Sequence, residues 1–260
     1  MTGQMLLHPM GLMELAVHCL RISLRNLPML LALAAVLLVP ILILTAIGGI
    51  LLFSAASMEA TTLRDILGVI LIILGIVGYV TLFGYFYAAV TLAVSLDVIG
   101  LKAGPIQILR RLRGTVGLQI LGTTFLQSLA VLGGLLLLII PGIVFFVRFA
   151  FAIPVVTLER TAYASAMRRS RELVTGQWWR LFGALLFFIM ITYIGSFMLG
   201  RILSVPIAML GVTWKEAYDI GYTLSSLVLM PVSFSYPVLL YYDLRIRKEP
   251  INIETIREAV

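Results

Sequence analysis

The chain alternates long runs of apolar residues with short polar segments. Helices that cross a membrane need about 20 apolar residues to span about 30 Å of hydrocarbon, and six runs are long enough. The pattern therefore predicts an all-α, polytopic membrane protein with a single integral membrane domain over residues 1–260. The predicted transmembrane helices lie at 28–56, 66–96, 117–140, 142–158, 181–206 and 218–242.

The breaks between these runs are short. Pro141 and Gly142 alone separate the third and fourth runs, which predicts a tight helical hairpin that turns at this pair. The segments 57–65 and 207–219 are also too short to hold a domain. Six crossings place both chain ends on the same side of the membrane.

Three amphipathic segments, 11–26, 105–114 and 162–175, precede the first, third and fifth runs. In the first, Glu14, His18, Arg21 and Arg25 recur at helical spacing and form one polar stripe. We expect short helices that lie in the membrane plane. The second and third segments share an Arg-Arg-x-Arg pattern, which suggests a threefold internal repeat of one short helix and two crossings.

The positive charges fix the expected orientation. Fifteen of the nineteen Lys and Arg residues fall in four segments, 1–26, 97–115, 159–180 and 243–260. Loops that stay on the cytoplasmic side retain such charges, so we expect both termini and all three in-plane helices there. The net charge of +7 is no sign of nucleic-acid binding, because the cations flank membrane segments. Anionic phospholipid headgroups are the expected counter-charge.

Several motifs together resemble one bacterial family. They are Ile140–Arg148, Pro154–Val156 with Glu159, Ala166–Arg171, Gly176–Trp179 and Tyr241–Glu249. They are similar to the membrane domain found beside some glycerophosphoryl diester phosphodiesterases, and to its stand-alone relatives of unknown function. The resemblance implies a six-helix domain of the bacterial cytoplasmic (inner) membrane. It does not imply the hydrolase, since this chain has no room for the catalytic barrel.

The candidate functional residues are mainly cations. Either the basic helices only set topology, or they bind anionic lipid or a protein partner through six arginines. Arg148 lies within an apolar run and would be either a structural arginine or a site that grips a phosphate or carboxylate. Glu159 is expected to pair with Arg169 or Arg171, and Asp97 to cap the next segment or pair with an arginine. Trp178 and Trp179 are expected to anchor at the interface. The six arginines are Arg110, Arg111, Arg113, Arg168, Arg169 and Arg171.

Motifs for catalysis are missing from the sequence. The chain has no phosphate-binding loop, HExxH or G-x-S-x-G pattern, and it has one cysteine and two histidines. We therefore expect no metal, no cofactor and no enzyme activity. The leading hypothesis is a lipid-interacting or scaffolding subunit that binds anionic phospholipids or another membrane protein. The alternative is the membrane subunit of a small-molecule or lipid exporter, with Arg148 facing a central cavity.

Overall fold

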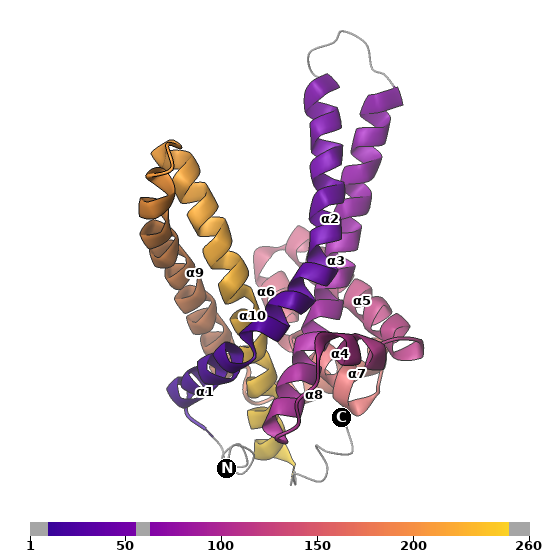
Figure 1. Ribbon diagram of the computed structural model, residues 1–260. Coiled ribbons are helices and arrows are strands. Elements are labelled where there is room, and N and C mark those ends of the chain that lie inside the picture. The colour runs from indigo at the N-terminus through magenta and orange to yellow at the C-terminus, as the bar shows by residue number, and fades with distance from the viewer. Residues whose placement is uncertain (1–9, 56–62, 250–260) are drawn as a thin grey trace.

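The computed structural model describes residues 10–55 and 63–249 (Figure 1). Within these residues every regular element is an α-helix, in agreement with the predicted fold class. The helices are α1 (Leu12–Arg25), α2 (Leu27–Ala55), α3 (Leu63–Val98), α4 (Pro105–Arg111), α5 (Thr115–Leu137), α6 (Ile139–Phe149), α7 (Ala152–Glu159), α8 (Tyr163–Val174), α9 (Trp178–Ala208) and α10 (Trp214–Lys248).

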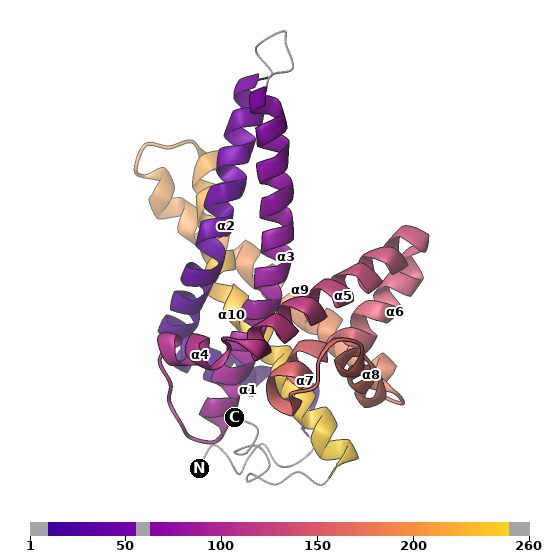
Figure 2. The ribbon, with the colours of Figure 1, turned by 90° about the vertical axis from the view of Figure 1, so that its right-hand side faces the viewer.

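Three helical hairpins diverge from a common base. We call them arms: α2–α3, α5–α6 with α7, and α9–α10. They point in different directions, and α1, α4 and α8 lie near the base (Figures 1 and 2). The order of a short helix followed by a hairpin thus occurs three times along the chain. Each short helix packs on one arm: α4 on the first, α8 on the second, and α1 on α10 of the third. The last contact closes the base into a ring.

The chain is a multi-pass membrane protein by the length and apolarity of its helices. Five spans within the described residues qualify, and a sixth qualifies if α1 and the first part of α2 count as one broken span. Those two helices meet at an angle of 75°. The bend lies at Asn26, where α1 ends and the Asn26 side-chain amide donates to the carbonyl of Ile22.

The first short helix forms as its polar stripe predicts. Leu15, Cys19 and Ile22 are buried on one face of α1, while Glu14 and Arg21 are exposed on the other. The buried face packs against α10, where the Cys19 thiol lies 3.4 Å from the carbonyl oxygen of Val232. This short helix is therefore part of the packed base.

Two helix boundaries in the second arm lie close to prolines, and one of them differs from the prediction. The expected turn at Pro141-Gly142 is wrong: α5 ends at Leu137, Leu138 is extended, and both residues lie in the first turn of α6. The predicted span at 142–158 is confirmed within a qualifying span over Ile139–Glu159, which is divided into α6, ending at Phe149, and α7, beginning at Ala152. A proline ring clashes with the carbonyl four residues earlier, which for Pro141 and Pro154 are Leu137 and Ala150.

Packing is concentrated at the base. In α3 nearly every residue from Phe86 to Val98 is buried, and in α10 so is every residue from Val238 to Leu244. Toward the arm tips large apolar side chains are exposed, as at Leu136, which is 88% exposed. Such surface is stable only against hydrocarbon, which is the environment that a membrane supplies.

Candidate functional site

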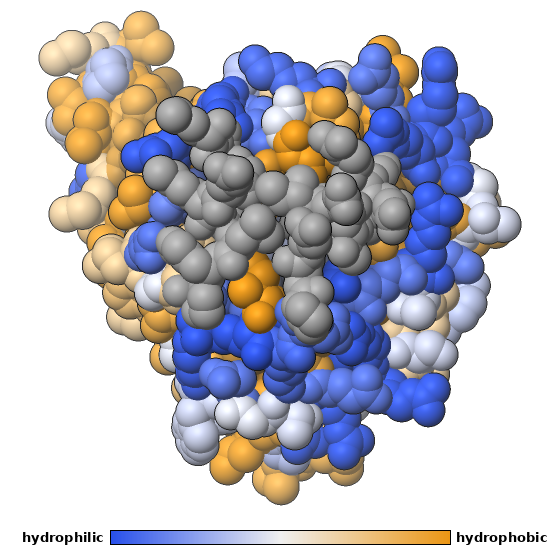
Figure 3. Space-filling model, turned by 90° about the horizontal axis from the view of Figure 1, so that it is seen from below, coloured by the Kyte–Doolittle hydropathy of each residue, from blue (hydrophilic) through white to orange (hydrophobic). Residues whose placement is uncertain are grey.

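The basic helices lie on the hydrophilic face of the molecule. Seen from below, the described residues around the uncertain segments are largely hydrophilic, while apolar side chains dominate the arm that projects beyond them (Figure 3). Five of the six candidate arginines are exposed on this base: Arg110, Arg111, Arg113, Arg168 and Arg171. The sixth, Arg169, is not.

Arg169 belongs to an internal ion network. Its Nε donates to Glu159 Oε2 at 2.8 Å, and its Nη2 donates to Glu249. The Tyr241 hydroxyl donates to Glu159 Oε1 at 2.7 Å, so the carboxylate ties α7 and α8 to α10. Burial alone would lower the pKa of Arg169, but the bonds from Glu159 and Glu249 outweigh it and raise that pKa. Glu159 thus makes one of the two pairs proposed for it, and Arg169 stabilises the fold instead of facing a ligand.

Arg168 and Arg171 stand at the edge of an apolar groove. The groove has a volume of about 500 Å³ and lies between α8 and the second arm. Neither arginine side chain forms an ion pair within the described residues. The other lining residues are all apolar: Leu126, Leu129, Ala130, Phe149, Ala164 and Met167. Two guanidinium groups beside an apolar groove have the chemistry to contact both a phosphate group and a hydrocarbon chain.

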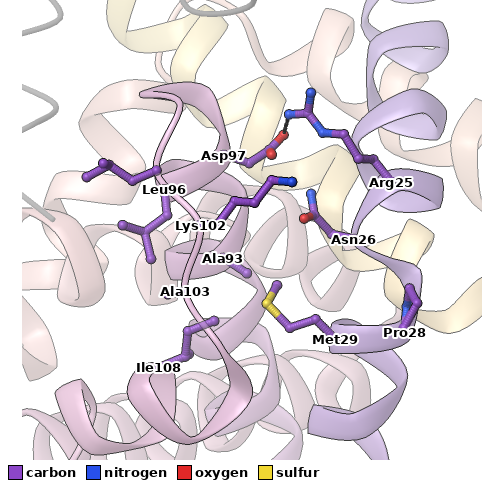
Figure 4. Close-up of a pocket in the computed structure, with 11 residues that line it drawn as sticks. Arg25, Asn26, Pro28, Met29, Ala93, Leu96, Asp97, Lys102, Ala103 and Ile108 are labelled. Carbon is purple, nitrogen blue, oxygen red and sulfur yellow. Dashed lines mark hydrogen bonds and ion pairs between the residues drawn. The ribbon is translucent and has the colours of Figure 1, made fainter.

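A second, smaller pocket lies at the base of the first arm. It has a volume of about 270 Å³ and is lined by residues of α1 to α4 and the adjoining loops. Arg25 forms an ion pair with Asp97, which is the arginine pairing expected for this aspartate. Lys102 is exposed and points toward that pair and Asn26 (Figure 4). Sequence reasoning did not single out Lys102, because nothing in its local pattern showed that it would meet Arg25.

Asp243 links distant segments of the chain, and sequence reasoning did not predict this role. Its carboxylate is fully buried, and Oδ2 lies 2.9 Å from Arg180 Nη1 and 2.9 Å from Arg247 Nε. Its Oδ1 accepts a hydrogen bond from the backbone N–H of Met10 at 3.0 Å. The two guanidinium groups also donate to the carbonyl of Met10, at 3.2 and 3.1 Å. The site therefore joins the residue that precedes α1 to α9 and α10.

These acids occupy equivalent places in the three arms. Asp97 lies in the last turn of α3, Glu159 ends α7, and Asp243 lies in the last two turns of α10. Each pairs with an arginine near the start of a hairpin or on a short helix: Arg25, Arg169 and Arg180. The three units therefore share a carboxylate near the base end of the last helix of each arm.

The surroundings of Arg148 do not support a ligand-binding role. It is partly buried on α6, and its side chain forms no ion pair within the described residues. Its backbone carbonyl accepts a hydrogen bond from the Ser170 hydroxyl at 2.8 Å. The structure has a central cavity between the arms, but Arg148 does not line it. The expected meeting of Arg148 with a central cavity is therefore wrong.

The two tryptophans begin α9 at the base. Trp179 is 78% exposed, while the Trp178 ring stacks on Phe182 with centroids 5.2 Å apart. Exposed indole at this level suits the interface between headgroups and hydrocarbon, where tryptophan is enriched.

Comparison with protein-family models, with curated proteins and with solved structures finds no match to this chain. The resemblance to the phosphodiesterase-associated membrane domain thus stays a prediction. Within residues 10–55 and 63–249, no three His, Cys, Asp or Glu side chains are grouped so as to hold a metal ion.

Proposed function

We propose that this protein is a non-catalytic, lipid-interacting or scaffolding subunit of the bacterial cytoplasmic membrane, and that it binds anionic phospholipid at its base. The main support for this proposal is the apolar groove beside Arg168 and Arg171. A phosphate would accept hydrogen bonds from the two guanidinium groups, while an acyl chain lies along Leu126 and Leu129. Each basic residue near an anionic surface contributes about 1 kcal/mol.

This proposal assigns phospholipid binding to two of the six candidate arginines, Arg168 and Arg171. Arg169 is excluded because it is held by Glu159 and Glu249. Arg110, Arg111 and Arg113 are exposed but line none of the three cavities described here. They would attract anionic headgroups by charge alone, whereas Arg168 and Arg171 offer a shaped site.

Replacing both Arg168 and Arg171 with glutamine is expected to weaken retention of phosphatidylglycerol about thirtyfold in neutral detergent, because two charge-assisted hydrogen bonds to the phosphate are lost at about 1 kcal/mol each. Native mass spectrometry in mild detergent, with added phosphatidylglycerol, measures the bound fraction. The matched control is Arg110→Gln with Arg113→Gln, which removes the same charge and should cost less than about fivefold. Equal losses in both double variants would show general charge attraction and contradict a built site.

The proposed orientation places the base in the cytoplasm and the arm tips outside. Its support is that the basic segments of α4, α8 and the end of α10 share the base. We expect a fluorescent protein fused after Val260 to fluoresce, and alkaline phosphatase inserted after Gly211 to be active, since that enzyme folds only outside. The reverse pattern would show that the base lies outside the cytoplasm, and it would contradict binding of phospholipid from the cytoplasmic leaflet.

One observation favours the alternative of a lipid exporter subunit. The arms border a partly open cavity of about 600 Å³ between them. Its lining has no charged side chain, so it suits an apolar molecule better than a polar solute. Bound partner subunits, if co-purified in stoichiometric amounts, would assign the protein to such a complex.

A further inference from the structure

The central cavity lies between all three arms. Residues of α3, α5, α6, α7, α9 and α10 line it, and its volume of about 600 Å³ lies within the range of pockets that hold small ligands. Much of one wall is aromatic: the Phe234 ring lies 4.6 Å from Phe83 and 5.4 Å from Tyr87 between ring centroids. The lining also includes aliphatic residues such as Val131 and Leu132 of α5.

The lining is poorly suited to an ion. It contains no Asp, Glu, Lys, Arg or His. Most of its hydroxyl groups already donate within the protein: Thr124 to the carbonyl of Ile120 at 2.8 Å, and Thr192 to that of Phe188 at 2.9 Å. Tyr87 donates to the carbonyl of Ala150 at 3.3 Å. A charged ligand would lose its hydration here and find no counter-charge.

Two lining residues, Gln127 and Tyr236, have a buried polar side-chain atom without a hydrogen-bond partner within the described residues. The side-chain oxygen of Gln127, on α5, is buried and makes no hydrogen bond within the described residues. Buried amides are normally paired, and in a membrane no bulk water reaches such a group. A hydroxyl group of a ligand could donate to this oxygen.

We propose that the central cavity binds the hydrocarbon chain of an uncharged lipid whose hydroxyl group donates to Gln127. Aromatic and aliphatic walls contact the chain, the absence of charge excludes anionic headgroups, and the unpaired amide selects a neutral hydrogen-bonding group. This site is distinct from the phospholipid groove at Arg168, and it takes a different class of lipid. It does not depend on the proposed function at that groove.

The test uses a photoreactive probe, hexadecanol with a diazirine in its chain, added to the full-length protein in nanodiscs of phosphatidylethanolamine and phosphatidylglycerol. We expect crosslinks on peptides that contain Phe83, Val131 or Phe234, and competition by unlabelled hexadecanol. Palmitate, which carries a carboxylate on a chain of the same length, should compete at least tenfold less well.

Two variants report on the two parts of the site. Gln127→Leu should reduce labelling about tenfold, and it should keep or raise the melting temperature because it removes an unpaired amide. Val131→Trp should place an indole in the cavity, narrow it and reduce labelling at least tenfold. The control Leu118→Trp alters an exposed residue of α5 that lines none of the described cavities, and it should label like the wild type.

The proposal is overturned if palmitate competes as well as hexadecanol, or if crosslinks fall only on the outer surface of the arms. It is also overturned if both Gln127→Leu and Val131→Trp label normally. The melting temperature in detergent serves as the folding check for Val131→Trp, which should melt close to the wild type.

Discussion

Replacing Asp243 with alanine is expected to destabilise the protein by about 3 kcal/mol, because two arginines then lose their buried counter-charge. Asp243 is fully buried, while the Arg180 and Arg247 side chains are 25% and 29% exposed. Water can reach the two guanidinium groups in part, so we place the loss at the low end for a broken buried pair. The backbone N–H of Met10 also loses its acceptor.

The measurement is the melting temperature in detergent, which should fall by about 10 °C in a protein of this size. Asp243→Asn separates the two contributions, since an amide can still accept from Met10 but carries no charge. Asp219→Ala is the matched control: the residue lies on the same helix, is exposed and forms no ion pair within the described residues. If Asp243→Ala melts like Asp219→Ala, the ring closure at the base contributes nothing to stability.

Replacing Gly200 with leucine is expected to force α9 and α10 apart. A Cβ at Gly200 would lie 2.9 Å from the Cα of Tyr222, and one at Gly221 would lie 2.6 Å from the carbonyl oxygen of Gly200. These neighbours are backbone atoms, so no side-chain rotation relieves the overlap. Small residues allow such close contact between membrane helices, and Ser196, Ser204 and Ser225 are buried in the same arm.

We expect Gly200→Leu to cost about 3 kcal/mol, as overpacking of a tight interface does, and to lower the melting temperature by about 10 °C. Gly183→Leu provides the comparison, since a Cβ at Gly183 on the same helix meets no atom within 4 Å. It should leave the melting temperature within about 2 °C of wild type. Equal effects of the two substitutions would show that leucine disturbs α9 regardless of its contact with α10.

Local patterns predicted the elements well. The polar stripe of 11–26 gave the short helix α1, and the apolar runs gave the long helices, because hydropathy and helical spacing depend only on nearby residues. The helix breaks near Pro141 and Pro154 were only partly open to prediction. Each proline ring would clash with the carbonyl four residues earlier, but Pro40, Pro206, Pro231 and Pro237 lie inside unbroken helices, so a proline alone does not locate a break.

Contacts between distant segments were harder to predict. Glu159 and Arg169 are ten residues apart, so their pairing was within reach of the sequence. Asp243 and Met10 are 233 residues apart, and no local pattern links them. The apolar lining of the central cavity was not predicted for a related reason: hydropathy gives the same value to an apolar side chain that fills a bundle and to one that lines a space within it.

The concentration of packing at the base has a consequence for how this sequence evolves. Most side chains in the outer halves of the arms face hydrocarbon, where one apolar residue replaces another at little cost. Apart from close helix contacts such as Gly200 with Tyr222, those stretches are therefore free to diverge. The base combines close packing with buried charge pairs, so substitutions there cost more stability and its residues should change more slowly. Ancestry shared among the three units, or with other proteins, would persist longest around Asp97, Glu159, Asp243 and their arginines, and would fade first along the arms.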